Sequence, residues 1–294
     1  MTQTSFFVPL TDQGLIRASG EDAAVFLHNL LTNDINHLAA GEARHAGLCT
    51  AKGRMLASFL IWREGADFLL MLSADILPDI LKKLAMYVLR SKVKLADITA
   101  ERTLFGVAGG NVAPAEAMAT APIAGGTAIR LDGERCVLAL PTGQPLPDLP
   151  PAGHLDDWHL AEIRAGIPRI VAATQEAFTP QMVNFELPAV GGVSFQKGCY
   201  PGQEIVARTQ YLGKVKRRMF RVKLENEFAP GTDVFTPEAG DQHCGAVVLT
   251  APSTHGGYES LLVVQSSGAE DDAIFVGTPA GAHARLLPLP YPVE

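Results

Sequence analysis

The sequence is poor in the residues that build metal sites and disulfide frameworks. Its 294 residues include four cysteines, Cys49, Cys136, Cys199 and Cys244, which lie far apart. No Cys-x-x-Cys motif is present, and no Cys/His pair has the spacing of metal ligands. We therefore expect no metal ligands, neither for a structural zinc ion nor for an iron–sulfur cluster held by this chain.

The chain also lacks an excess of positive charge and long apolar runs. Its formal net charge is −7 at pH 7, whereas broad binding of nucleic acid needs clustered positive charge. No segment reaches the ~20 consecutive apolar residues needed to cross a bilayer, and residues 1–20 show no targeting pattern. We therefore expect a cytoplasmic protein that makes no direct contact with nucleic acid or with a membrane.

Hydrophobic periodicity predicts a mixed α+β first half. One apolar stripe predicts a helix within residues 19–34, opened by a capping box at Ser19–Asp22. A second stripe predicts a helix over residues 77–88, with Pro78 tolerated in its first turn. The strands expected in this half are residues 57–62, 68–72, 93–99 and 104–108, the first two as a hairpin.

Composition changes along the rest of the chain. Residues 111–126 are rich in alanine, glycine and proline, and residues 141–153 contain five prolines, which predicts loops or a linker in both ranges. A helix is predicted over residues 156–166, and the short β-favouring runs after residue 216 predict a small β-barrel. The domains expected are an N-terminal α+β unit (1–110), a second α+β unit (111–211) and a C-terminal β-barrel (212–294).

The segment from Lys197 to Glu204, Lys-Gly-Cys-Tyr-Pro-Gly-Gln-Glu, concentrates reactive side chains around two glycines. Glycine permits backbone conformations that a Cβ forbids, and Pro201 fixes one φ angle. If Pro201 opens a helix, Cys199 lies at the positive end of that helix beside Lys197, and both effects lower the pKa of a thiol. If the segment is a strand, this argument fails. The residues alone also fit an ordinary turn with a buried cysteine.

With Ser194–Gln196 before it and Ile205–Arg208 after it, this segment resembles the signature of the YgfZ family of folate-binding proteins, relatives of the glycine-cleavage T-protein, an aminomethyltransferase. The resemblance implies an α+β, T-protein-like multi-unit folate-binding fold that ends in a small β-barrel. It also implies a role in iron–sulfur cluster assembly or repair in client enzymes, including enzymes that modify tRNA. The resemblance covers nearly the whole chain through four further blocks, Gly20–Asp34, Lys52–Arg54, Glu162–Pro168 and Thr179–Asn184.

The same resemblance implies site residues, a cofactor and partners. Any catalysis would fall to Cys199, Lys197 and Tyr200. The expected cofactor is tetrahydrofolate, with or without a polyglutamate tail, and the expected partners are folate and iron–sulfur client or assembly proteins. A pterin edge favours acidic and amide side chains between apolar walls. The expected cofactor-binding residues are Asn33, Asp34, Glu162, Arg164, Asn184, Gln203 and Glu204, although a cap, turn or surface role explains several of them equally well.

Two departures separate the chain from a true T-protein. The strand after the glycine block offers Ala57 and Ser58 where T-proteins carry a catalytic aspartate, and neither can act as a carboxylate. The T-protein segment Arg-Leu-Glu-Ala-Gly reads Glu-Ile-Arg-Ala-Gly over residues 162–166, with acid and base exchanged. Two alternatives stay open: an aminomethyltransferase that uses tetrahydrofolate with another acid such as Asp34, and an interaction module with a vestigial folate cleft.

A dense basic run follows the signature in this acidic chain. It predicts a site for the polyglutamate tail of folate or for the acidic face of a partner. The alternative is a solvated β edge guarded by lysine and arginine. The run consists of Lys214, Lys216, Arg217, Arg218, Arg221 and Lys223, and the eight histidines of the chain show no comparable pattern of base and nucleophile.

Overall fold

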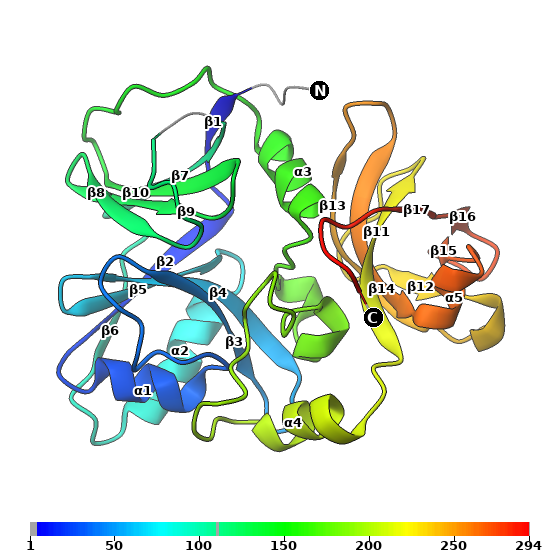
Figure 1. Ribbon diagram of the computed structural model, residues 1–294, viewed down its shortest axis with the longest axis horizontal. Helices are drawn as coiled ribbons and strands as arrows, with labels where there is room; N and C mark the ends of the chain where they lie inside the picture. The colour runs from blue at the N-terminus through cyan, green and yellow to red at the C-terminus, as the bar shows by residue number, and fades with distance from the viewer. Residues whose placement is uncertain (1–4, 110–111, 294) are drawn as a thin grey trace. The chain divides into compact units, whose positions relative to one another are not determined.

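The computed structural model describes residues 5–109 and 112–293 (Figure 1). The contacts divide the chain into two compact units whose segments alternate along the sequence. Unit 1 consists of Met1–Leu48, Ala57–Trp158 and Gln196–Tyr200, and unit 2 of Cys49–Leu56, His159–Phe195 and Pro201–Glu294. The domain boundaries expected at residues 110 and 211 stay a prediction.

Unit 1 contains two sheets and two helices. One sheet has the strand order β3 (Ala43–Cys49), β4 (Met55–Glu64), β5 (Asp67–Ser73), β2 (Gln13–Ser19) and β6 (Lys94–Asp97). The other has the order β1 (Phe6–Pro9), β7 (Arg102–Ala108), β10 (Arg135–Pro141), β9 (Gly126–Arg130) and β8 (Thr120–Ile123). Figure 1 shows α1 (Ala23–Leu30) and α2 (Leu77–Val88) below the first sheet and the second sheet above it.

The core of unit 1 lies between these two sheets. Leu15 and Trp62 from the first sheet pack in one buried cluster with Ile129 and Val137 from the second. Trp158, in the first turn of α3 (Leu155–Ala165), completes the cluster. Burial of apolar side chains contributes roughly 25 cal/mol per Å² of area removed from water. The two sheets are therefore held together by their facing apolar surfaces, and the opposite face of the first sheet is left to the helices.

Unit 2 is built around a C-terminal, nearly closed barrel of seven strands. Two apolar clusters fill it and its surroundings; one contains Val222 and Val234, the other Phe185 and Met219. Its helices beyond α3 are η1 (Ala172–Thr174), η2 (Pro180–Val183), α4 (Gln203–Leu212), η3 (Pro237–Ala239) and α5 (Ser266–Glu270). The strand order is β16 (Ala282–His283), β15 (Phe275–Val276), β12 (Asp233–Phe235), β13 (Gly245–Pro252), β14 (Tyr258–Gln265), β11 (Arg217–Leu224) and β17 (Arg285–Leu287).

The structure confirms the α+β class and the C-terminal barrel. The helices expected near residues 77–88 and 156–166 are α2 and α3, and the predicted hairpin is β4 with β5. None of the helices formed by the described residues has the length and apolar character needed to span a membrane.

Two local predictions are wrong. The capping box does not form, because α1 begins after Asp22, whose side chain makes no capping hydrogen bond and instead accepts one from the backbone N–H of Lys92 at 2.7 Å. Residues 111–126 are not a continuous loop, because β8 forms within them and pairs with β9. In unit 1, the strands β1, β2, β3, β8, β9 and β10 escaped prediction.

Candidate functional site

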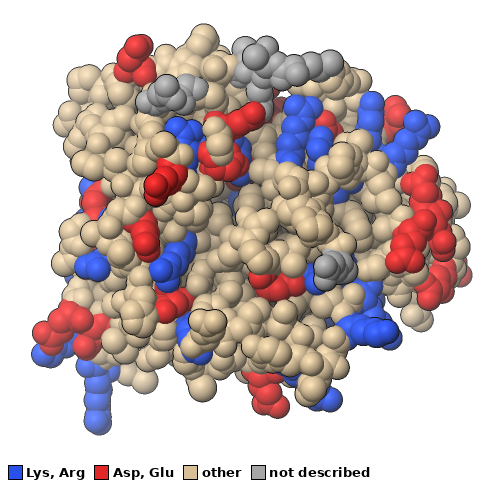
Figure 2. All heavy atoms as spheres, in the orientation of Figure 1, with Lys and Arg blue, Asp and Glu red and all other residues tan. Residues whose placement is uncertain are grey.

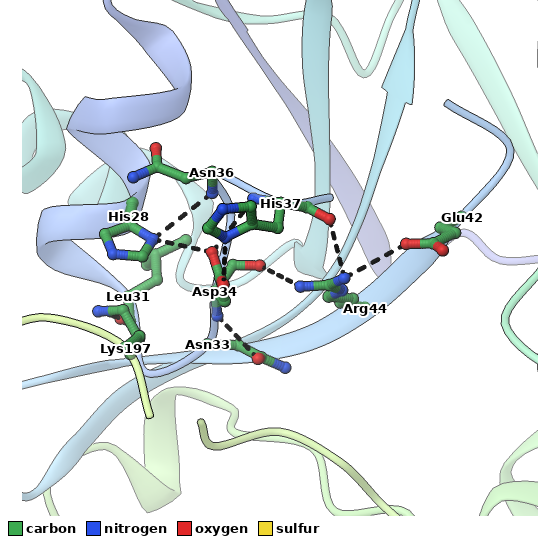
Figure 3. Close-up of polar contacts among 9 residues, drawn as sticks. All are labelled: His28, Leu31, Asn33, Asp34, Asn36, His37, Glu42, Arg44 and Lys197. Atoms are coloured by element: carbon green, nitrogen blue, oxygen red, sulfur yellow. Dashed lines mark hydrogen bonds and ion pairs between the residues drawn. The ribbon is translucent and has the colours of Figure 1, made fainter. Parts of the chain in front are cut away.

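In unit 1, the chain leaving α1 turns so that the Asp34 carboxylate lies between two imidazoles (Figure 3). Its Oδ1 is 3.1 Å from Nδ1 of His28, and its Oδ2 is 2.7 Å from Nδ1 of His37. Arg44, on β3, donates from Nη1 to the backbone carbonyl oxygen of Asp34 at 2.6 Å. Contacts with Asp34 therefore hold the end of α1, the turn that follows it and β3 together.

The environment sets the charges of this cluster. Burial opposes ionisation of Asp34, but the side-chain and backbone hydrogen bonds with His37 outweigh it and hold the pKa of Asp34 below its usual value. Burial lowers the pKa of His28, and the nearby Lys197 charge lowers it further against the opposing Asp34 carboxylate. At neutral pH we therefore expect an ionised Asp34 beside a neutral His28 imidazole.

Lys197 attaches the signature segment to the end of α1. Its Nζ donates to the carbonyl oxygen of Leu31 at 2.9 Å and lies 4.6 Å from the ring centroid of Tyr200. The last carbonyls of a helix lack intrahelical partners and carry the negative end of the helix dipole, so a cation is stabilised there. Burial lowers the pKa of Lys197 to about 8, although the neighbouring Asp34 and Cys199 oppose this shift. The ammonium thus fixes a loop on which Cys199 is exposed.

The structure therefore brings together five of the residues predicted from the sequence. Asn33 shapes the turn, because its Nδ2 donates to the carbonyl oxygen of His45 at 2.7 Å and its Oδ1 accepts the backbone N–H of Asp34 at 2.8 Å. Asp34 and Lys197 lie in one cluster, with Tyr200 against Lys197 and Cys199 between them in the chain.

Sequence reasoning missed His28, His37 and Arg44. It treated the histidines as scattered, but two of them contact Asp34. The available signal was their spacing around a predicted helix end: Asp34 follows His28 by six residues and precedes His37 by three.

In unit 2, the second part of the signature is a turn followed by a helix. Gly202, with a φ of +83°, precedes α4, which begins at Gln203. The expectation that Pro201 opens the helix is wrong, and so is the strand alternative. The helix starts two residues later, so Cys199 precedes its first residue by four positions. Glu204 is exposed in the first turn, where a carboxylate complements the helix dipole.

Two other sequence blocks pack against this turn within unit 2. A Cβ on Gly202 would lie 2.4 Å from the carbonyl oxygen of Thr50 and 2.7 Å from the Cα of Gly53, so the glycine block touches the signature directly. Gln181, at the start of the approach to the signature, donates from Nε2 to the carbonyl oxygen of Val206 at 2.7 Å. Blocks far apart in sequence therefore meet around the start of α4.

The remaining predicted cofactor residues differ in how many partners they have. Arg164 donates from Nη2 to Oε1 of the buried Glu259 at 2.8 Å. Asn184 is fully buried and donates from Nδ2 to the carbonyl oxygen of Met219 at 2.8 Å. Oε2 of Glu162 and Oδ1 of Asn184 are both buried and accept no hydrogen bond from the described residues, and Nη2 of Arg169 lies 4.0 Å from the Glu162 oxygen. A buried carboxylate oxygen without a donor is suited to an N–H group of a ligand.

The basic run is not uniformly available to a ligand. Arg218 donates to Oε1 of the buried Glu186 at 2.5 Å, and Arg221 to Oε2 of Glu259 at 2.6 Å. Both guanidinium groups therefore neutralise buried carboxylates. Lys214 and Lys216 are exposed and precede β11. The polyglutamate hypothesis loses Arg218 and Arg221 as ligands.

The cysteines and β4 limit which groups can act as a nucleophile, a catalytic acid or a metal ligand. Cys49, Cys136 and Cys244 are buried, and Cys199 is exposed. Ala57 and Ser58 are buried within β4, so this strand presents no carboxylate at the position where the resemblance expects one. Among the residues that the structure describes, no three Cys, His, Asp or Glu side chains gather as a metal-ligand set.

Comparisons with known proteins agree with the fold described above. Residues 8–120 match the GCVT N-terminal domain. A protein named tRNA-modifying protein YgfZ from Photorhabdus laumondii is 31% identical over 310 residues, covering 97% of this chain and 92% of that protein. Its namesake from Klebsiella pneumoniae is 30% identical with the same coverage. The crystal structure of the glycine cleavage system aminomethyltransferase T from Bartonella henselae matches with a TM-score of 0.74 over 97% of this chain and 85% of that chain, at 17% identity.

Proposed function

Because this chain belongs to the YgfZ family, whose fold is that of the glycine-cleavage aminomethyltransferase, we propose that it is a tetrahydrofolate-binding accessory protein. In this proposal it supports iron–sulfur cluster assembly or repair in client enzymes, including enzymes that modify tRNA. The name of its relatives supports the link to tRNA modification. The negative net charge favours a link through client proteins over direct contact with tRNA.

One observation carries the proposal: the 2.9 Å hydrogen bond from Nζ of Lys197 to the carbonyl oxygen of Leu31. It joins the family signature to the turn that contains Asn33 and Asp34. The signature loop is thereby held on a rigid helix end with Cys199 exposed to solvent, and not buried as a packing residue. A thiol fixed in this way can meet a group presented by another protein, whereas a buried thiol cannot.

The residues of the fold fit a reduced pterin. When bound, tetrahydrofolate would supply a carrier for one-carbon groups. The buried Oε2 of Glu162 is an acceptor for an N–H group of the pterin, because it accepts no hydrogen bond from the described residues. Arg164 fits a supporting role better than direct contact, since it pairs with Glu259, whereas Asn184 donates to Met219 and keeps a buried Oδ1 as a second acceptor for the ligand. Gln203, which is half-buried, and Glu204 stay proposed ligands at the start of α4.

Two features weigh against turnover by the route of the T-protein. β4 lacks the catalytic carboxylate, and the alternative acid Asp34 already contacts His28 and His37. General acid–base groups typically contribute about 10² to 10⁴ in rate. An aminomethyltransferase without such a group would therefore be severely slowed. Release of ammonia by the purified protein with an aminomethyl-lipoyl carrier and tetrahydrofolate would instead favour that function.

Calorimetric titration with tetrahydrofolate and its polyglutamate, on the wild type and on Cys199→Ala, tests the proposal. We expect saturable binding by both proteins, because Cys199 is not among the folate ligands. In cells under oxidative stress, we expect Cys199→Ala to lose the cluster-dependent activity of the client. Absence of folate binding by both proteins would overturn the proposal. Full client activity with Cys199→Ala would remove the thiol from it.

A further inference from the structure

The solvent-facing side of α4 is unusually apolar for a surface helix. Ile205, Tyr211 and Leu212 are 38%, 69% and 85% exposed. Ile205, Arg208 and Leu212 follow one another at helical spacings of three and four residues, so they form one stripe, with Tyr211 beside its end. The opposite side of the helix holds it in unit 2 through the buried Val206. Ile205 also packs near Gly53, where an added Cβ would lie 3.1 Å from the Ile205 Cβ, and the Tyr211 ring meets Phe195 edge-on with 5.9 Å between centroids. Leu212 is therefore the most exposed apolar side chain of the stripe.

Positive charge lies along the C-terminal part of this apolar stripe, while the exposed Glu204 precedes its start. Between residues 205 and 224 the chain carries no acidic residue. Arg218 and Arg221 neutralise buried glutamates, but Arg208, Lys214, Lys216 and Arg217 form no ion pair with the described residues. Figure 2 shows Lys and Arg side chains at the lower right, where Figure 1 draws the end of α4 and the start of β11. An acidic chain thus presents a local basic surface.

Guarding of a sheet edge does not explain this surface. Along β11, residues 221–223 pair with β17 as well as with β14, so the strand is interior there. Of the four cations that form no ion pair, Arg217 alone lies on the part of β11 that pairs with β14 and not with β17. Arg208 belongs to a helix, and Lys214 and Lys216 precede the strand. Three of these four cations therefore do not lie on an unpaired edge of the sheet.

We propose that Ile205, Arg208, Tyr211, Leu212, Lys214, Lys216 and Arg217, here termed the α4 surface, form the docking site for an acidic client protein. This inference rests on the proposed function and names the face that the client uses. Tyrosine and arginine dominate the energetics of protein interfaces, and apolar side chains at the centre exclude water. Phosphates and glutamate tails would use the cations but gain nothing from Ile205 and Leu212. The mixed character of the surface therefore favours a protein. In the chain, α4 begins with the last two residues of the signature, Gln203 and Glu204.

The test uses two double variants of the full chain and a purified acidic iron–sulfur enzyme that modifies tRNA. Lys214→Glu with Lys216→Glu reverses charge, and Tyr211→Ser with Leu212→Ser removes apolar area. We expect each pair to weaken client binding at least about tenfold, equivalent to ~1.4 kcal/mol, and only the charge pair to abolish the salt dependence of binding. Two matched control pairs on α2 and just after it should bind the client like the wild type. They are Lys82→Glu with Lys83→Glu, and Met86→Ser with Leu89→Ser.

Three further measurements separate the possible outcomes. Equal client binding by wild type and variants, or no client binding at all, would overturn the proposal. The proposal would also be overturned if the variants lost binding only to tRNA or to free poly-γ-glutamate in the same assay, since these ligands need charge alone. Tetrahydrofolate titration of the same variants should be unchanged. If the wild type binds the client but not folate, the proposed function fails while the docking site stands.

Discussion

Nζ of Lys197 donates a hydrogen bond to the carbonyl oxygen of Leu31 across 166 positions of sequence. This contact fixes the signature loop on the end of α1, and it does so with a buried ammonium that donates to a backbone carbonyl. Such a group carries both a positional role and an energetic cost, because burial disfavours its charged form.

The pH dependence of stability reveals that cost. Burial lowers the pKa of Lys197 from 10.5 to about 8, so between these values the unfolded chain binds more protons than the folded chain. Stability of the wild type relative to Lys197→Met should therefore rise with pH across this window, by about 3 kcal/mol. Urea unfolding of both proteins at pH values below and above the window measures it. A difference in unfolding free energy that does not change with pH would contradict a depressed lysine pKa.

Thiol accessibility provides a second test. Burial raises the pKa of Cys49 to about 12 and that of Cys136 to about 11, and Cys244 is 1% exposed. The thiolate is the reactive form, so these three cysteines should resist a thiol-alkylating reagent in the folded protein. Mass spectrometry should find one modification on the native wild type and none on Cys199→Ala. Rapid labelling of a second cysteine without denaturant would show that the buried thiols are reached by opening of the structure.

The turn at Gly202 should not tolerate a side chain. Alanine there would adopt a positive φ and would also meet the backbone of Thr50 and Gly53. Gly143 is a matched control, with a φ of +82° and nothing within 4 Å of an added Cβ. We expect Gly143→Ala to cost about 1 kcal/mol for backbone strain alone. Gly202→Ala should cost at least about 2 kcal/mol more, because of the added collisions. Equal loss of unfolding free energy in the two variants would mean that the backbone around Gly202 moves easily.

Glu162 allows a direct test of the folate site. Glu162→Gln keeps the size of the side chain but removes its charge, so it should weaken tetrahydrofolate binding by about 1.5–3 kcal/mol, the range of a hydrogen bond to a charged group. Arg164→Gln breaks a contact with Glu259 instead and should lower stability more than folate affinity. Calorimetry and thermal unfolding of both variants separate the two effects. Unchanged folate affinity in Glu162→Gln would exclude its carboxylate as a ligand.

The sequence predicted elements whose burial follows a simple period. α2 has one buried face, formed by Leu77, Ile80 and Leu84, and its periodicity is clear. β2 escaped because its first four residues are all buried, and burial alternates only toward the end of the strand. The alternation expected of a half-exposed strand is absent when both faces are covered, and no local pattern then distinguishes a strand from other buried chain.

The candidate site was predictable in its residues but not in its contacts. The resemblance pointed to Asp34 and Lys197 separately, yet their meeting depends on a chain reversal after α1 and on a partner 166 residues away. The pairings of Arg218 with Glu186 and of Arg221 with Glu259 were hidden for the same reason, so two guanidinium groups that neutralise buried carboxylates were counted as part of a free basic surface. Charge pairing between distant residues depends on the tertiary fold, so no short stretch of sequence predicts it.

The alternation of the two units decides how this protein can be divided. The stretch that matches the GCVT N-terminal domain ends at residue 120, where β8 has only begun, and it lacks β9 and β10. A fragment cut there would leave β7 without its neighbour β10 and would lack the five residues 196–200 that complete unit 1. We expect no single cut in the chain to release a piece that folds on its own. A protease nick at an exposed loop should instead leave both pieces associated until denaturant separates them.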